Sequence, residues 1–173
     1  MAAILLAGPE HIDQIVSLNK RYLLTNLPKG KTGKGFIRIE YSEAEILEII
    51  RNGEIAIALS GTKVQGYFLI GKRTDNPRLE YQRKGALSLS GMIGASFEKI
   101  GYGCQVCIDE NYRGLGLYKD MISFIAEKVN GKYDFLLSTI STENRISLQN
   151  SLAIGWKPIN SSKEFDFYIY QIK

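Results

Sequence analysis

The stretch IDENYRGLGLYKDM, residues 108–121, is the most informative segment of this chain. It places Gly114 and Gly116 beside Arg113, at the point where an apolar run ends and an amphipathic run begins. Glycine in the first turn of a helix costs roughly 0.5–1 kcal/mol relative to alanine. That cost is offset where the backbone must turn sharply, or where a ligand must approach the main chain closely.

The segments on either side of the glycines have the patterns of a strand and a helix. A strand is expected at 102–108, and a helix is expected at 115–129 with inward residues Leu117, Met121, Ile122, Ile125 and Val129. A helix N-terminus presents unpaired N–H groups and about half a positive charge, which together favour a phosphate. The residues alone also permit a second reading, in which the glycines only form a tight turn.

Two other phosphate-binding motifs do not fit the sequence. The dinucleotide fingerprint G-x-G-x-x-G would need a third glycine where Lys119 stands. The letters GKT at 30–32 match the end of a Walker A loop, but its first glycine would fall on Thr25.

The rest of the chain alternates between short strands and helices. Strands are expected at residues 3–7, 54–60, 64–72, 134–140, 156–159 and 165–172, and further helices at about 9–23, 42–50 and 144–154. Ser42 and Glu45 form a capping-box pattern, and Gly61 marks a hairpin turn. Residues 74–99 keep no sustained period and are expected to be irregular or partly helical.

This order of elements contains one strand–helix–strand crossover. It predicts an α/β (α+β) fold with a mixed, mostly antiparallel central sheet and one parallel strand pair, flanked by helices. A length of 173 residues suits a single domain over 1–173.

The composition is that of an ordinary globular protein. Lys and Arg number 22 against 18 Asp and Glu, and this net charge of +4 is spread along the chain, so nucleic acid is not an expected partner. No apolar run reaches the roughly 18 residues of a membrane span. We expect a cytoplasmic protein that does not bind a membrane.

The two cysteines, Cys104 and Cys107, suggest neither a disulfide nor a metal site. They lie three residues apart on an expected strand, which puts their side chains on opposite faces. The only histidine, His11, has no matching ligand motif nearby. We therefore expect reduced cysteines and no bound metal.

Two segments carry a resemblance to a known family. Ile108, Asp109, Tyr112, Arg113, Gly114 and Gly116 fall on the pattern V-D/x-P-x-Y-R-G-x-G-x-G/A, the acyl-CoA pyrophosphate loop of the GNAT superfamily. Glu110 replaces its common proline, and Tyr118 replaces its last small residue. The stretch NRISLQNSLAIGW is similar to the family's N-x-x-[AS]-…-G-F segment through Asn144, Ser147 and Gly155. The resemblance spans essentially the whole chain and is weaker before residue 100.

The resemblance implies an N-acetyltransferase that moves an acetyl group from acetyl-CoA to a primary amine in a ternary complex. The parallel strands would splay apart around the pantetheine arm, and the main-chain N–H of Ile108 would stabilise the thioester oxygen. The implied acetyl-CoA-binding residues are Cys107, Ile108, Arg113, Gly114, Leu115, Gly116, Leu117, Tyr118, Asn144 and Ser147.

The acid and the base are left open by the sequence. Ser151 stands where many relatives carry a tyrosine that protonates the thiolate, so Ser151 and Tyr118 are both candidate acids. Gln105 stands where some relatives carry a glutamate, and the carboxylates of Asp109 and Glu110 lie near the strand end. Proton removal through water, or catalysis by positioning alone, is a further option. A non-catalytic acyl-CoA-binding domain of the same fold is the alternative function.

The acceptor is expected against segments 24–38 and 74–99, the longest stretches without a period. Basic residues in or next to these segments include Lys29, Lys31, Lys34, Arg38, Arg73, Arg78, Arg83 and Lys84. If these faced the cleft, an anionic small molecule bearing an amine would be favoured; a solvated rim is the other reading. The acyl chain length and a homodimer are left open.

Overall fold

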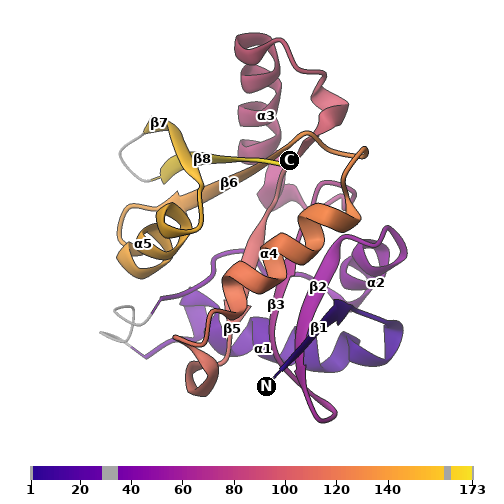
Figure 1. Ribbon diagram of the computed structural model, residues 1–173. Coiled ribbons are helices and arrows are strands. Elements are labelled where there is room, and N and C mark those ends of the chain that lie inside the picture. Colours follow the sequence, from indigo (N-terminus) through magenta and orange to yellow (C-terminus); the bar gives the residue numbers. More distant parts are fainter. Residues whose placement is uncertain (1, 29–34, 162–164, 173) are drawn as a thin grey trace.

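The computed structural model describes residues 2–28, 35–161 and 165–172 (Figure 1). Over these residues the strands form two sheets, ordered β1-β2-β3-β5 and β4-β6-β8-β7. The first contains β1 (Ala3–Leu6), β2 (Ile55–Ser60), β3 (Lys63–Leu69) and β5 (Gln105–Ile108). The second contains β4 (Ile100–Gly101), β6 (Phe135–Ser141), β7 (Lys157–Ser161) and β8 (Phe165–Gln171). Only β4 and β6 pair in parallel, so the expected mixed, mostly antiparallel arrangement is confirmed.

The two sheets separate at Gly103. The chain pairs with β6 through β4, leaves that sheet, and then pairs with β3 through β5. Gly103 has a φ of +76°, and a Cβ there would lie 3.1 Å from the Gly71 backbone, so this position requires glycine. The predicted strand 102–108 is therefore too long at its start. The parallel strands run together only briefly and then splay apart, as the resemblance implied.

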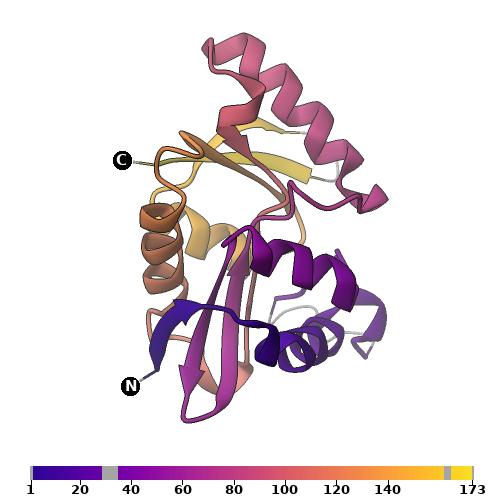
Figure 2. The ribbon, with the colours of Figure 1, turned by 90° about the vertical axis from the view of Figure 1, so that its right-hand side faces the viewer.

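Five α-helices cover the two sheets: α1 (Ile12–Tyr22), α2 (Glu43–Arg51), α3 (Glu80–Ile93), α4 (Leu117–Lys128) and α5 (Arg145–Ala153), within the described ranges. Figure 2 shows α1 and α2 on one face of the first sheet and α4 on the other. The alternation of β2 explains this arrangement. Ile57 packs in the cluster with α1 and α2, whereas Ala56 packs in the cluster with α4.

The predicted local signals around α2 and the hairpin are confirmed. The Glu45 N–H donates to Ser42 Oγ at 3.3 Å, and the Ser42 N–H donates to Glu45 Oε2 at 2.8 Å. Gly61 turns the hairpin between β2 and β3 with a φ of +60°. All five residues predicted to face inward from α4 are buried.

The segment 74–99 is more regular than predicted. It contains α3, preceded by the 3-10 turn η4 (Pro77–Leu79) and followed by η5 (Phe97–Lys99). The buried residues of α3 are Gln82, Ala86 and Leu89, which share one face of the helix. Because Gln82 is polar and Ala86 is small, this face does not read as an apolar stripe in the sequence. Gly85 lies under the Phe167 ring of β8, where an added Cβ would approach within 2.4 Å. A contact distant in sequence thus fixes this helix.

The two cysteines face opposite sides of the first sheet, as predicted. Cys104 packs in the α4 cluster and Cys107 in the α1 and α2 cluster, and both thiols are free. In the part of the chain that the structure describes, no helix has the length and apolar character needed to cross a membrane.

Candidate functional site

The larger cavity of the site, about 830 Å³, opens where β5 ends and α4 begins. Its walls come from β5, the loop that follows it, the start of α4, α5 and the segment 35–37. The lining residues are Tyr22, Gly35, Phe36, Ile37, Val106, Cys107, Ile108, Glu110, Asn111, Tyr112, Arg113, Gly114, Gly116, Leu117, Tyr118, Lys119, Asn144, Ile146, Ser147, Asn150, Ala153 and Ile154.

The glycine pair shapes the floor of this cavity. Gly114 and Gly116 have φ values of +78° and +80°, a conformation that residues with side chains rarely adopt. An added Cβ at either position would meet no atom within 4 Å, so the space above the backbone is open. Leu117 is buried and anchors the start of α4 in the core. The first N–H groups of α4 lack intrahelical acceptors and lie at the cavity, which suits an anion.

Two cations stand beside this helix terminus. The Arg113 Nε donates to the Ile108 carbonyl at 3.0 Å, and its guanidinium lies 4.8 Å from the centre of the Tyr22 ring. Lys119, which stands where the dinucleotide fingerprint would need a glycine and was not predicted to bind a ligand, also lines the cavity. Both charges would attract a pyrophosphate to the same place as the helix N-terminus.

The main-chain N–H of Ile108 points into the gap between the sheets. The Asp109 N–H donates to the Gln65 carbonyl at 2.8 Å, and Ile108 pairs with Gly66. Hydrogen-bonded and non-hydrogen-bonded pairs alternate along an antiparallel ladder, so Ile108 turns its N–H away from β3. The Ile108 N–H is therefore available as a backbone donor at the edge where β5 and β6 have separated.

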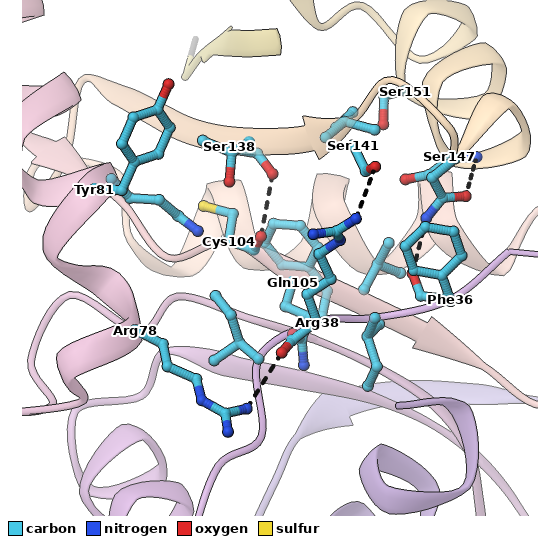
Figure 3. Close-up of a pocket in the computed structure, with 18 of the residues that line it drawn as sticks. Phe36, Arg38, Arg78, Tyr81, Cys104, Gln105, Ser138, Ser141, Ser147 and Ser151 are labelled. Atoms are coloured by element: carbon cyan, nitrogen blue, oxygen red, sulfur yellow. Dashed lines mark hydrogen bonds between the residues drawn. The ribbon is translucent and has the colours of Figure 1, made fainter. Parts of the chain in front are cut away.

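A smaller cavity of about 250 Å³ adjoins the larger one (Figure 3). Its lining residues are Phe36, Ile37, Arg38, Ile39, Phe68, Arg78, Tyr81, Gln82, Cys104, Gln105, Val106, Tyr118, Ser138, Thr139, Ile140, Ser141, Asn144, Ser147 and Ser151. Residues common to both cavities are Phe36, Ile37, Val106, Tyr118, Asn144 and Ser147. Molecules bound in the two cavities would therefore meet among these six residues, which include Tyr118.

Tyr118 and Ser151 bring two hydroxyl groups together at this junction. The Tyr118 hydroxyl lies 3.2 Å from Ser151 Oγ, and the Tyr118 ring stacks on Phe68 with centroids 6.2 Å apart. Burial raises the pKa of the Tyr118 phenol well above its ordinary value near 10, so the phenol stays protonated at neutral pH. The hydroxyl expected from position 151 in relatives is thus matched here by one from α4.

The three residues near the expected base position differ in their access to the site. Gln105 lines the smaller cavity, and its Nε2 donates to the Tyr67 hydroxyl at 2.8 Å. The Asp109 carboxylate lines neither cavity and accepts from Arg21 at 2.7 Å. Glu110 lines the larger cavity. Among the described residues that line the smaller cavity, none is an aspartate, a glutamate or a histidine.

Asn144 connects the walls of the two cavities. Its Oδ1 accepts from the Ser147 N–H at 3.3 Å and caps α5, while its Nδ2 donates to the Phe36 carbonyl at 2.8 Å. One side chain therefore holds α5 against the segment that carries Arg38. This contact requires the amide of asparagine, since it uses a donor and an acceptor at once.

Most of the residues predicted to bind acetyl-CoA lie together at the larger cavity. Leu115 is the exception, because it does not line the cavity and its side chain is 64% exposed. Ser151 lines only the smaller cavity. In the described ranges, no group of three His, Cys, Asp or Glu side chains is placed to hold a metal ion.

The basic residues predicted around the acceptor are only partly brought together. Arg38 and Arg78 line the smaller cavity, whereas Arg73, Arg83 and Lys84 line neither cavity. Arg83 and Lys84 instead pair with Glu80 on α3, at 2.8 and 3.6 Å. The three lysines of the other segment, Lys29, Lys31 and Lys34, lie outside the described residues.

Comparison with known proteins identifies the fold. No model of a known protein family and no curated protein matches the sequence.

Solved structures, in contrast, do match the fold of this chain. A GNAT-family acetyltransferase from Listeria monocytogenes is 17% identical with a TM-score of 0.71, over 98% of this chain and 94% of that one. An N-acetyltransferase from Staphylococcus aureus is 15% identical with a TM-score of 0.67, over 100% and 99%. A GNAT-superfamily phosphinothricin acetyltransferase from Sinorhizobium meliloti, in complex with acetyl-CoA, is 15% identical with a TM-score of 0.65, over 99% and 88%. The two sheets separate next to the N-terminus of α4, which follows the glycine pair. This chain has the fold of the GNAT acetyltransferases.

Proposed function

We propose that this protein is an N-acetyltransferase whose single domain, residues 1–173, transfers an acetyl group from acetyl-CoA to a primary amine. The observation that carries the proposal is the junction of two cavities at the gap between β5 and β6. One cavity ends on a helix N-terminus suited to a pyrophosphate, and the other is large enough for a small acceptor. The similarity in fold to acetyltransferases, one of them bound to acetyl-CoA, supports the same reading.

In this proposal the pyrophosphate of acetyl-CoA rests on the main-chain amides of residues 113–118. Arg113 and Lys119 add positive charge at that position. The pantetheine arm runs along the open edge of β5, towards Val106 and Ile108. Its thioester then lies at the junction of the cavities.

The chemistry follows from the groups at the junction. The amine nitrogen attacks the thioester carbonyl, and the oxygen that becomes negative accepts from the Ile108 N–H. The new C–N bond forms, the C–S bond breaks, and the thiolate leaves beside the Tyr118 hydroxyl. A thiol with a pKa of about 8.5 leaves as thiolate at pH 7 for about 2 kcal/mol. An amine with a pKa of about 10.4 costs about 4–5 kcal/mol to deprotonate.

Removing a proton from the amine is thus the larger task. Because the described residues lining the smaller cavity include no carboxylate and no imidazole, this proton leaves through water. Tyr118 donates a hydrogen bond to the departing thiolate, because Tyr118 lines both cavities whereas Ser151 lines only the smaller one. The tyrosine missing at position 151 would favour a non-catalytic acyl-CoA-binding domain, but the Tyr118 hydroxyl beside Ser151 supports catalysis.

The direct test combines binding and turnover. Calorimetry with acetyl-CoA measures binding, and release of the CoA thiol with a panel of amines measures transfer, with mass spectrometry identifying the acetylated product. We expect binding and transfer to at least one primary amine. A folded protein that does not bind acetyl-CoA would refute the proposal, and binding without transfer to any amine would support the non-catalytic alternative.

A further inference from the structure

We infer that the acceptor is a small primary amine that also carries an anionic group, and that Arg38 and Arg78 recognise that group in the smaller cavity. This inference rests on the proposed acetyl transfer and adds the chemical class of the acceptor. It starts from the charges that the cavity presents, taken together with the size of the cavity.

Arg38 reaches across the opening between the two sheets. Its Nη2 donates to Ser141 Oγ at 3.4 Å, which connects the segment 36–39 to the end of β6. Its guanidinium lies 5.8 Å from the centre of the Phe36 ring. Figure 3 shows this side chain between Ser141 and the Gln105 side of the cavity. Arg38 is exposed, and the contact with Ser141 places its guanidinium at the rim of the cavity that it lines.

Arg78 approaches the same cavity from η4. Its Nη1 donates to the Arg38 carbonyl at 3.4 Å, so the two arginines come from different segments and meet at one wall. Tyr81 and Gln82 line the cavity beside Arg78. Two guanidinium groups thus line a cavity whose described lining residues include no carboxylate.

This charge pattern selects between classes of acceptor. A guanidinium presents a planar set of donors that matches a carboxylate or a phosphate. A polyamine or a lysine-rich peptide would instead bring further positive charge against Arg38 and Arg78. The cavity therefore favours an amine whose other end is anionic.

The size of the cavity limits the acceptor further. Its volume of about 250 Å³ lies just below the roughly 300–1,000 Å³ of pockets that bind drug-sized ligands, so the cavity suits a smaller molecule. A free amino acid or a short amino phosphate is of this size, whereas a folded protein surface would have to enter through a single extended side chain.

The orientation of the acceptor follows from which residues each cavity contains. Tyr118 lies at the junction with the larger cavity, where the thioester is placed, whereas Arg38 and Arg78 line only the smaller cavity. An acceptor with its amine towards Tyr118 would direct its anionic group towards the arginines. The hydroxyl groups of Ser138 and Ser141 lie along the same wall and offer further hydrogen bonds.

The test uses matched pairs of amines. Free amino acids are compared with their carboxamides, which have almost the same shape but no carboxylate, and O-phosphoethanolamine with ethanolamine. Spermidine and a lysine-rich peptide represent the cationic class. We expect kcat/KM for the anionic member of at least one pair to exceed that of its neutral partner by about tenfold or more. The carboxamides have the less basic amines, so a preference for the acids cannot arise from amine deprotonation. The preferred pair distinguishes a carboxylate from a phosphate.

Variants then assign the preference to the two arginines. Arg38→Gln and Arg78→Gln should each raise KM for the anionic amine by about tenfold or more, and change it for the neutral partner by less than about twofold. Arg51→Gln, at the end of α2 and outside both cavities, removes the same charge and should change neither value. Unchanged acetyl-CoA affinity shows that each variant is folded.

Three results would overturn the inference. They are equal use of acids and carboxamides, preference for spermidine or the lysine-rich peptide, and failure to acetylate any anionic amine by a protein that acetylates other amines. Failure to bind acetyl-CoA, or to acetylate any amine at all, would overturn the proposed function itself, so the two failures can be told apart.

Discussion

Tyr118 and Ser151 carry side chains of the opposite size to those that the family resemblance leads one to expect at these two positions. The motif resembled by residues 108–118 calls for a small residue at 118, and many relatives place a tyrosine at 151. In this structure the aromatic side chain comes from position 118 and the small one from position 151, and their hydroxyl groups lie 3.2 Å apart. The pair therefore keeps a phenol at the junction of the two cavities.

Replacing Tyr118 by Phe tests this assignment. We expect kcat to fall by up to about thirtyfold, which corresponds to the roughly 2 kcal/mol that unassisted thiolate departure costs. Acetyl-CoA affinity should be unchanged, because the phenol interacts with the leaving thiolate rather than with the bound cofactor. Since burial raises the pKa of Tyr118, the wild-type kcat should show no loss from phenol ionisation up to about pH 10. Steady-state kinetics between pH 6 and 10 measure both effects.

Ser151→Ala is the matched control for Tyr118→Phe, since it removes the other hydroxyl of the pair. Its turnover should stay within about tenfold of the wild type and above that of Tyr118→Phe, because Ser151 lines only the smaller cavity and contacts the Tyr118 hydroxyl. A large loss in Ser151→Ala together with a small one in Tyr118→Phe would assign the acid to Ser151 instead.

The glycines before α4 allow a second prediction at this scale. Gly116→Glu should weaken acetyl-CoA binding by about a hundredfold or more, because a carboxylate would lie where the pyrophosphate is placed. The chain should still fold, since an added Cβ has open space around it. Calorimetry measures the affinity, and circular dichroism the fold.

Gly131→Glu separates the loss of the site from backbone strain. Gly131 has a φ of +83° and open space around it, as Gly116 does, but it lies in the turn after α4 and lines neither cavity. Both variants pay about 1–2 kcal/mol for a left-handed residue with a side chain. Equal acetyl-CoA affinity in the two variants would contradict the pyrophosphate assignment.

At the scale of elements, the cap of α5 links helix stability to the site. Asn144→Ala removes the hydrogen bond to the Ser147 N–H and leaves the Phe36 carbonyl without its donor. We expect a loss of about 1–3 kcal/mol in the free energy of unfolding and a higher KM for the acceptor, because the segment carrying Arg38 loses its connection to α5. Urea denaturation and kinetics measure the two effects.

Ser42→Ala removes the comparable N-cap of α2, outside both cavities. It should lower stability by about 1 kcal/mol and leave KM unchanged. If Asn144→Ala altered only stability, as Ser42→Ala is expected to, Asn144 would have no part in positioning the acceptor wall.

The helices show which elements a sequence can reveal. The inward residues of α4 recur at helical spacing and the capping box of α2 is local, so both were predictable. The helix α3 was not predictable, because its buried residues include the polar Gln82 and its Gly85 is explained only by Phe167, far away in sequence.

The same limit applies to the functional site. The glycine motif was visible in the sequence, but the meeting of Arg38 with Arg78 depends on how η4 packs.

At the scale of the whole molecule, the separation of the sheets was predictable only through the family resemblance. The apolar run before residue 108 gave no sign that the strand begins at Gln105 and that the chain changes sheets at Gly103. That break depends on the close approach of Gly71 and Gly103, whose backbones share a hydrogen bond of 3.3 Å. Local pattern does not record a contact of this kind.

Burial of the cysteines on the two faces of the first sheet has a measurable effect on stability. Burial raises the pKa of the Cys107 thiol to about 12, and raises that of Cys104 as well. An unfolded thiol has a pKa of about 8.5, so above that pH the unfolded chain releases protons that the folded chain retains. The free energy of unfolding should therefore fall as the pH rises from about 8.5 towards 12.

Urea denaturation between pH 7 and 10.5 checks this slope, and Cys107→Ala should reduce it. Thiol-specific reagents at pH 8 should modify the native protein only as fast as it unfolds. Rapid modification of both thiols in native protein, or an unchanged slope in Cys107→Ala, would contradict the assignment.

The walls of the two cavities come largely from different parts of the chain, and this division bears on how new specificities could be evolved. The larger cavity depends on β5, α4 and α5, whereas Arg38, Ile39, Arg78, Tyr81 and Gln82 face only the smaller one. A randomised library confined to those five positions would vary the acceptor while leaving the donor half intact. Selection from such a library should yield catalysts that acetylate neutral or cationic amines at undiminished affinity for acetyl-CoA.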